Sequence, residues 1–143
     1  MLHLALVNKG RHSEHESQAT DSSSYEIDSA YSGEEAYEKV KEALRSHKPY
    51  AVILMDMRMP PGWDGLETSK KIFEIFPDTE IAIITAYSDF SQQEVFAQIN
   101  HTDHLQFKKK PFTLKEIKEL IQNLLKKWNT EHQVDLSKPL LEG

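Results

Sequence analysis

The sequence predicts an α/β fold in which a parallel β-sheet is covered by helices on both faces. Short apolar runs alternate along the chain with segments of helical periodicity, as they do in βαβ units. The runs Tyr50–Met55 and Glu80–Thr85 are largely apolar, which is typical of strands buried on both faces. Capping boxes at Ser32–Glu35, Ser91–Glu94 and Thr113–Glu116 mark the starts of three helices.

The composition fits one soluble domain and excludes several kinds of site. The chain has 143 residues, of which 38% are hydrophobic and 28% charged. The absence of cysteine excludes a disulfide scaffold, a thiolate metal site and a cysteine nucleophile. A net charge of −6 argues against nucleic acid as a partner. Because no apolar run approaches the ~18 residues of a membrane span, we expect a cytoplasmic protein with no membrane contact.

The N-terminal quarter of the chain is predicted to contain two strands, Leu2–Val7 and Tyr25–Tyr31. Between them, residues 11–24 are rich in Ser, Glu and His, and Ala19 is their one aliphatic residue. Such a segment is either a loop or a helix with no apolar face to bury. If this segment is the first helix of the fold, it is an atypical one.

The rest of the chain is predicted to contain four helices and three further strands. Asp64 begins a helix that Pro77 ends, and Trp63 just before it is expected to be buried over the preceding loop. A weaker strand is expected at His104–Lys108. The last helix carries the clearest apolar stripe, which continues to Trp128.

We expect one domain over residues 1–129, followed by a polar tail over residues 130–140. Residues 141–143 resemble a cloning scar and are left out of the fold prediction.

Three polar residues stand at or just after the ends of the three C-terminal strands: Asp56, Thr85 and Lys110. In a parallel sheet with right-handed crossovers these strand ends converge at one edge, where ligands bind. A rigidly held Asp56 can attack a phosphoryl group, Lys110 can neutralise the phosphate oxygens, and Thr85 can donate a hydrogen bond. A divalent metal such as Mg²⁺ normally supplies the remaining positive charge.

These residues and their surroundings resemble the receiver domains of two-component response regulators. The resemblance is carried by Ile53–Gly65, Ile83–Ala86 and Lys110–Phe112, and by Tyr25–Ala36 for the second strand and helix. The loop PPGWDG, Pro60–Gly65, is similar to that of receivers in or beside hybrid sensor kinases. The resemblance implies a flavodoxin-like, doubly wound parallel sheet of five strands in the order 2-1-3-4-5.

The resemblance also implies roles for individual residues. Asp56 matches the phospho-acceptor, Thr85 the switch hydroxyl, and Lys110 the family's lysine, whose bond to Pro111 is cis in the family. Phe107 matches the aromatic side chain whose rotamer follows activation.

The implied metal ligands are Asp56 and the backbone carbonyl of Arg58. Receivers end their first strand with two adjacent acids that bind Mg²⁺, but here Asn8 and Lys9 follow Val7. Asn8 offers at best a neutral oxygen, and Lys9 repels a cation. We therefore expect Mg²⁺ to bind weakly or not at all, and phosphorylation to be slow or absent.

The implied function is phosphorelay signalling, with a histidine kinase or phosphotransfer domain as the phosphodonor to Asp56. The face formed by the family's fourth helix, fifth strand and fifth helix is expected to switch and to offer a homodimer contact. The alternative is a degenerate receiver that acts as a protein-interaction or dimerisation module without efficient phosphorylation.

Two other interpretations are weaker. Haloacid-dehalogenase phosphatases also use a strand-end Asp, but they place a second Asp two residues later, where this chain has Arg58. We therefore expect no enzyme activity beyond self-catalysed phosphotransfer and dephosphorylation on Asp56.

His12 and His15 have the spacing of a metal pair on a helix, but a third ligand is not evident, and a solvated polar loop is the simpler interpretation.

Overall fold

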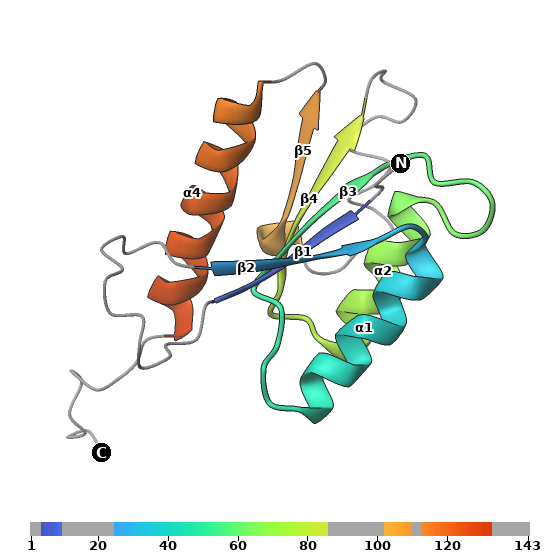
Figure 1. The fold of residues 1–143 in the computed structure, drawn as a ribbon, viewed down its shortest axis with the longest axis horizontal. Helices are drawn as coiled ribbons and strands as arrows, with labels where there is room; N and C mark the ends of the chain where they lie inside the picture. The colour runs from blue at the N-terminus through green and yellow to red at the C-terminus, as the bar shows by residue number, and fades with distance from the viewer. Residues whose placement is uncertain (1–3, 10–24, 86–101, 110–112, 133–143) are drawn as a thin grey trace.

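The computed structural model describes residues 4–9, 25–85, 102–109 and 113–132, which form one five-stranded sheet with helices on both faces (Figure 1). The strands lie in the order β2-β1-β3-β4-β5. Their bounds are Leu4–Lys9 for β1, Tyr25–Ala30 for β2, Val52–Asp56 for β3, Glu80–Thr85 for β4 and Leu105–Lys109 for β5. The strand order expected from the receiver resemblance is thus confirmed.

The helices of the described residues are α1, Gly33–Arg45, α2, Gly65–Ile75, and α4, Leu114–His132. A 3₁₀ turn, Thr102–His104, directly precedes β5. In Figure 1, α1 and α2 lie on one face of the sheet and α4 on the other. Because α4 continues to His132, the first residues of the expected polar tail are helical. None of the described helices is long and apolar enough to cross a lipid bilayer.

The direction of β1 differs from the prediction. Strands β3, β4 and β5 are parallel to one another, as expected, but β1 pairs antiparallel with both β2 and β3. Lys9 at the end of β1 is the partner of Tyr25 at the start of β2. A parallel neighbour requires a crossover, usually a helix, whereas antiparallel strands do not. The fully parallel sheet predicted from the sequence is therefore wrong for β1.

Two apolar clusters hold the layers together. On the face of α1 and α2, buried side chains of the sheet such as Ile53 and Ile81 pack against Val40 and Ile72. On the other face, buried sheet residues pack against the apolar stripe of α4, as expected, and Trp128 lies edge-on to Phe76 with ring centroids 5.8 Å apart. Continuous burial of β3 and β4 follows from this two-sided cover.

The helix starts are capped as the sequence predicts. The Ser32 hydroxyl accepts a hydrogen bond from the Glu35 amide, although the Glu35 carboxylate accepts from the amide of Tyr31 rather than that of Ser32. Thr113 and Glu116 form the reciprocal capping box at the start of α4, with distances of 2.8 and 3.0 Å. The third capping box, Ser91–Glu94, lies outside the described residues.

Candidate functional site

Asp56 is the last residue of β3 and lies at the edge of the sheet where β4 also ends. In the parallel pairing of these strands Asp56 is aligned with Ile84, and Thr85 is the next residue along β4. The Met57 amide, just beyond Asp56, donates a 3.0 Å hydrogen bond to the Ile84 carbonyl. Asp56 and Thr85 are both partly buried. The structure thus brings two of the predicted site residues to neighbouring strand ends.

Strand β5 continues this edge. Its Lys109 is aligned with Thr85, and its Phe107 is aligned with Ile83 and packs, partly buried, against the core. Lys110, its bond to Pro111, and Ala86 lie outside the described residues, so the expected lysine role and cis peptide bond stay predictions.

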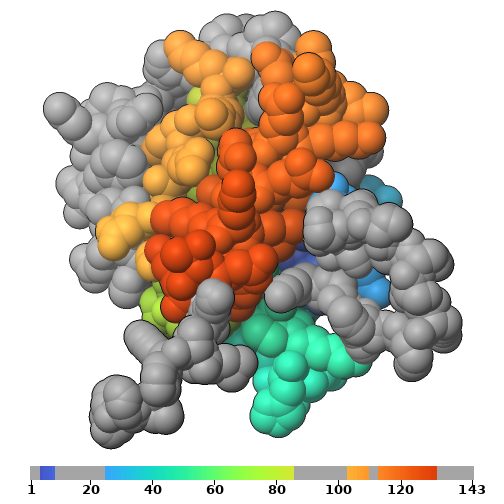
Figure 2. Space-filling model, turned by 90° about the vertical axis from the view of Figure 1, so that its left-hand side faces the viewer, coloured from blue at the N-terminus to red at the C-terminus, as the bar shows by residue number. Residues whose placement is uncertain are grey.

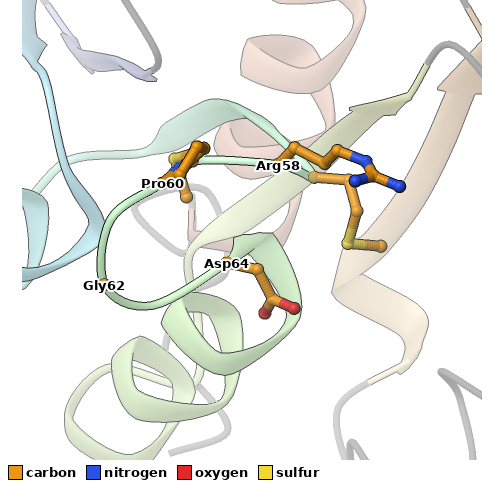
Figure 3. Close-up of a pocket in the computed structure, with 6 residues that line it drawn as sticks. Arg58, Pro60, Gly62 and Asp64 are labelled. Atoms are coloured by element: carbon orange, nitrogen blue, oxygen red, sulfur yellow. The ribbon is translucent and has the colours of Figure 1, made fainter.

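The loop after Asp56 forms a pocket of about 280 Å³, shown in Figure 3. Arg58 extends from the first part of this loop and Asp64 from its end. The Asp64 side chain accepts a 2.9 Å hydrogen bond from the Glu67 amide and so caps α2. Gly65 is required here, since a Cβ atom would lie 2.7 Å from the Asp56 carbonyl oxygen.

The same loop is tied to the start of α1. Gly62 has a φ of 104°, and a side chain there would meet the Glu34 carboxylate. The Trp63 amide donates to that carboxylate at 3.4 Å. The Trp63 ring is partly buried, edge-on to Tyr37 with centroids 5.6 Å apart, which agrees with the expected cover over the loop. The Pro60–Pro61 peptide bond in this loop is cis.

Asn8 does not lie beside Asp56. Because β1 is antiparallel to β3, Leu4 is the partner of Met55 and Val7 is the partner of Val52. Asn8 therefore lies beyond the start of β3, at the opposite end of the sheet from Asp56. Its Oδ1 atom is buried and has no hydrogen-bond partner in the described part of the chain. This placement removes the geometric basis for the predicted Asn8 metal ligand.

The described residues around Asp56 do not fit a carboxylate-rich Mg²⁺ site. Within the described ranges, the one group of three or more His, Cys, Asp or Glu side chains whose ligand atoms converge is Glu80, His104 and Glu131. Glu80 begins β4, whereas Thr85 ends it, so this group lies away from Asp56. The sequence analysis did not predict this cluster. The feature that could have indicated it is an acidic residue, Glu80, at the start of a strand that is otherwise apolar and buried.

The chain matches a protein-family model over most of its length. The family model described as the response regulator receiver domain matches residues 13–122, so the match begins after β1 and ends within α4. Among curated proteins, the oxygen regulatory protein NreC of Staphylococcus carnosus is 49% identical over 63 residues, which are 44% of this chain and 27% of that protein. The homologous NreC of Staphylococcus haemolyticus matches to the same extent. The chain therefore matches about a quarter of the length of these relatives.

Solved structures give the same fold. A response regulator receiver domain protein from Clostridium thermocellum superimposes with a TM-score of 0.56 at 22% identity, over 71% of this chain and 75% of that one. A structure described as adenylate cyclase from Rhodopirellula baltica superimposes with a TM-score of 0.59 at 27% identity, over 71% and 70% of the two chains.

Proposed function

Because this chain belongs to the response regulator receiver domain family, we propose that it works in phosphorelay signalling with Asp56 as its phosphoryl acceptor. The observation that carries this proposal is the position of Asp56 and Thr85 at the ends of two neighbouring parallel strands. Such strand ends hold side chains rigidly and leave them accessible to a ligand.

The proposed reaction takes a phosphoryl group from a phosphohistidine of a histidine kinase or phosphotransfer domain. One Asp56 carboxylate oxygen forms a bond to phosphorus while the nitrogen–phosphorus bond breaks, and the bonding electrons stay on the donor imidazole. The Thr85 hydroxyl donates a hydrogen bond to one phosphoryl oxygen, and the Lys110 ammonium neutralises the negative charge of another. Hydrolysis of the acyl phosphate by water then returns Asp56 to its starting state.

The proposed output of the reaction is a change on the β5 side of the molecule. Movement of Thr85 toward the phosphoryl group vacates space that Phe107 occupies in turn. Support comes from the pairing of β4 with β5, in which Phe107 lies one strand away from Thr85. The face that includes β5 and α4 is then the contact surface for a second copy or an output partner. We place the chain in the cytoplasm, where histidine kinases expose their phosphohistidines.

We also propose that Mg²⁺ assists this reaction poorly. Receivers in general use Mg²⁺ for phosphorylation, and the metal supplies charge stabilisation worth several kcal/mol. In the described part of this chain, no group of three acidic or histidine side chains converges on Asp56. Phosphoryl transfer therefore depends mainly on Thr85 and Lys110 and is slow.

Intact-mass measurement after incubation with phosphoramidate and Mg²⁺ tests these proposals. The full chain should gain the mass of one phosphoryl group slowly, and the variant Asp56→Asn should gain none. A gain that Asp56→Asn retains would show that another residue is the acceptor. A fast, stoichiometric gain would contradict the weak role of Mg²⁺.

A second candidate function is favoured by the direction of β1, which takes Asn8 away from Asp56. In that case the chain is an interaction or dimerisation module that works without phosphorylation. Sedimentation of the untreated chain distinguishes the two functions. A stable dimer that Asp56→Asn retains, together with no mass gain from phosphoramidate, would support the module and exclude the phosphorelay function.

A further inference from the structure

Glu80 is a buried acid at the end of the sheet opposite to Asp56. Only 1% of Glu80 is exposed, and both carboxylate oxygens are engaged. Its Oε2 atom lies 2.8 Å from Nδ1 of His104, and its Oε1 atom accepts from Nζ of Lys127 at 2.9 Å. A buried carboxylate is unfavourable unless it has such partners. The chain therefore has a specific arrangement to keep an acid at this position.

A second carboxylate, that of Glu131, repeats the pattern from α4. Its Oε1 atom lies 3.8 Å from Nδ1 of His104, and its Oε2 atom lies 3.8 Å from Nζ of Lys127. Each of the two acids thus turns one oxygen toward His104 and the other toward Lys127. Lys127 also donates to the Asp103 carbonyl at 2.6 Å, which fixes its ammonium group.

From this geometry we propose that Glu80, His104 and Glu131 bind one divalent transition-metal ion of the Zn²⁺ class. The three ligand atoms lie within 4.8 Å of one another. Tetrahedral Zn²⁺ with bonds of about 2.0–2.1 Å requires its ligand atoms to be about 3.3 Å apart. The separations of His104 Nδ1 from the two carboxylates, 2.8 and 3.8 Å, lie on either side of that value. Small side-chain movements are enough to accept the ion.

Lys127 contacts both carboxylates of the proposed site. It holds Oε1 of Glu80 and contacts Oε2 of Glu131, which are the oxygens turned away from His104. Donors that hold the outer oxygens of metal-binding carboxylates orient them and strengthen binding. With a neutral imidazole, the two carboxylates and the ammonium sum to a net charge of −1, which favours a cation.

Solvent can reach the proposed site from the side of Glu131. The side chains of His104 and Glu131 are 19% and 37% exposed, whereas Glu80 forms the buried floor. In Figure 2, α4 and the segment with the 3₁₀ turn and β5 lie side by side on the face toward the viewer. Three protein ligands leave the fourth Zn²⁺ position for water. The ion would join the start of β4, the turn before β5, and the last part of α4.

Metal binding at this site is expected to compete with protons. His104 must present the lone pair of Nδ1, so a proton on that atom has to leave when the ion binds. Mg²⁺ prefers oxygen ligands and an octahedral shell, so it should bind here much more weakly than Zn²⁺. This selectivity also separates the site from any weak Mg²⁺ binding near Asp56.

Isothermal titration of the full chain with Zn²⁺ tests the proposal. We expect one ion per chain, with little heat from Mg²⁺ and with an affinity that falls as the pH is lowered. Glu131→Gln removes an exposed ligand, and His104→Gln keeps a donor for Glu80, so both variants should fold. Each should weaken Zn²⁺ binding by at least about tenfold.

Two controls make the result decisive. Glu119→Gln changes an exposed acid on the same helix outside the cluster, and it should leave Zn²⁺ affinity unchanged. The double variant His12→Gln and His15→Gln removes the other possible metal pair and should also leave it unchanged. Absence of Zn²⁺ binding, or binding that depends on His12 and His15 but not on His104 and Glu131, would overturn the proposal and leave the cluster as an ion-pair network.

Discussion

Leu4 lies opposite Met55 in the antiparallel pairing of β1 with β3. Strand β1 therefore begins at the end of the sheet where β3 finishes with Asp56, and β1 finishes at the opposite end. In a receiver whose first strand is parallel, the end of that strand would lie beside Asp56 instead. Two predictions test the direction of β1.

Restoring an acid pair at the end of β1 should not restore Mg²⁺-assisted phosphorylation. In the variant Asn8→Asp with Lys9→Asp, the new carboxylates would lie at the far end of the sheet from Asp56. The rate of mass gain from phosphoramidate and Mg²⁺ should match that of the parent chain. A rise of roughly tenfold or more, the size expected when a metal adds charge stabilisation, would mean that β1 runs parallel to β3.

A designed disulfide should report the register of β1 and β2. Ala5 is the partner of Ser29, and the chain has no other cysteine, so Ala5→Cys with Ser29→Cys should form an intramolecular disulfide on mild oxidation. Thiol counting and intact mass measure the yield. Ala5→Cys with Glu26→Cys is the control, because three residues along a strand, about 10 Å, exceed the reach of a disulfide. Efficient bridging of the control pair alone would contradict the register.

Removing the Lys127 ammonium should destabilise the fold. Lys127→Met leaves the buried Glu80 carboxylate with one partner fewer, and Lys127 is 36% exposed. The expected loss in the free energy of unfolding is about 2 kcal/mol, below the ~3–5 kcal/mol of a fully buried pair because water partly replaces the cation. Denaturant unfolding measures the loss, and Lys126→Met on the exposed side of α4 is the control. If Lys127→Met and Lys126→Met lowered the free energy of unfolding equally, Lys127 would have no special role in stability.

Glu80 should also give stability a distinctive pH dependence. Burial raises the pKa of Glu80 above 4.5, although the hydrogen bonds from Lys127 and His104 act in the opposite direction. Since the folded pKa is the higher one, the favourable contribution of this group is complete below the unfolded pKa and is lost as pH rises through the folded pKa.

The variant Glu80→Gln isolates this contribution, because glutamine resembles the protonated acid at every pH. The free energy of unfolding of Glu80→Gln minus that of the parent chain should increase as the pH rises above about 4.5. Denaturant unfolding at several pH values measures the difference. A difference that falls over this range would show that Lys127 and His104 outweigh the effect of burial.

The parts of the fold that carry a strong local signal could be predicted from the sequence. Strands β3 and β4 are apolar because both of their faces are covered, and the capping residues Ser32, Asp64 and Thr113 fix the helix starts. The direction of β1 carries no such signal. A short apolar strand has the same composition whichever way it runs, and its direction is known from its pairings, such as Leu4 with Met55 and Lys9 with Tyr25.

The candidate site, like the fold, could be predicted only in part from the sequence. Asp56 and Thr85 were expected at neighbouring strand ends because parallel strands finish at a common edge, and the structure places them there. The position of Asn8 was not predictable, since it depends on the direction of β1. The cluster of Glu80, His104 and Glu131 joins residues far apart in sequence, and no spacing rule connects them.

The pairing of Lys9 with Tyr25 has a consequence for the length of chain that joins β1 to β2. Antiparallel partners can be joined by a tight turn of about two residues, whereas a parallel pair must recross the sheet, about 20 Å for a strand as long as β1. The distance between Lys9 and Tyr25 therefore does not require a long connection. Replacing the residues between these strands with Asn-Gly would give a shortened chain whose first two strands form a minimal hairpin.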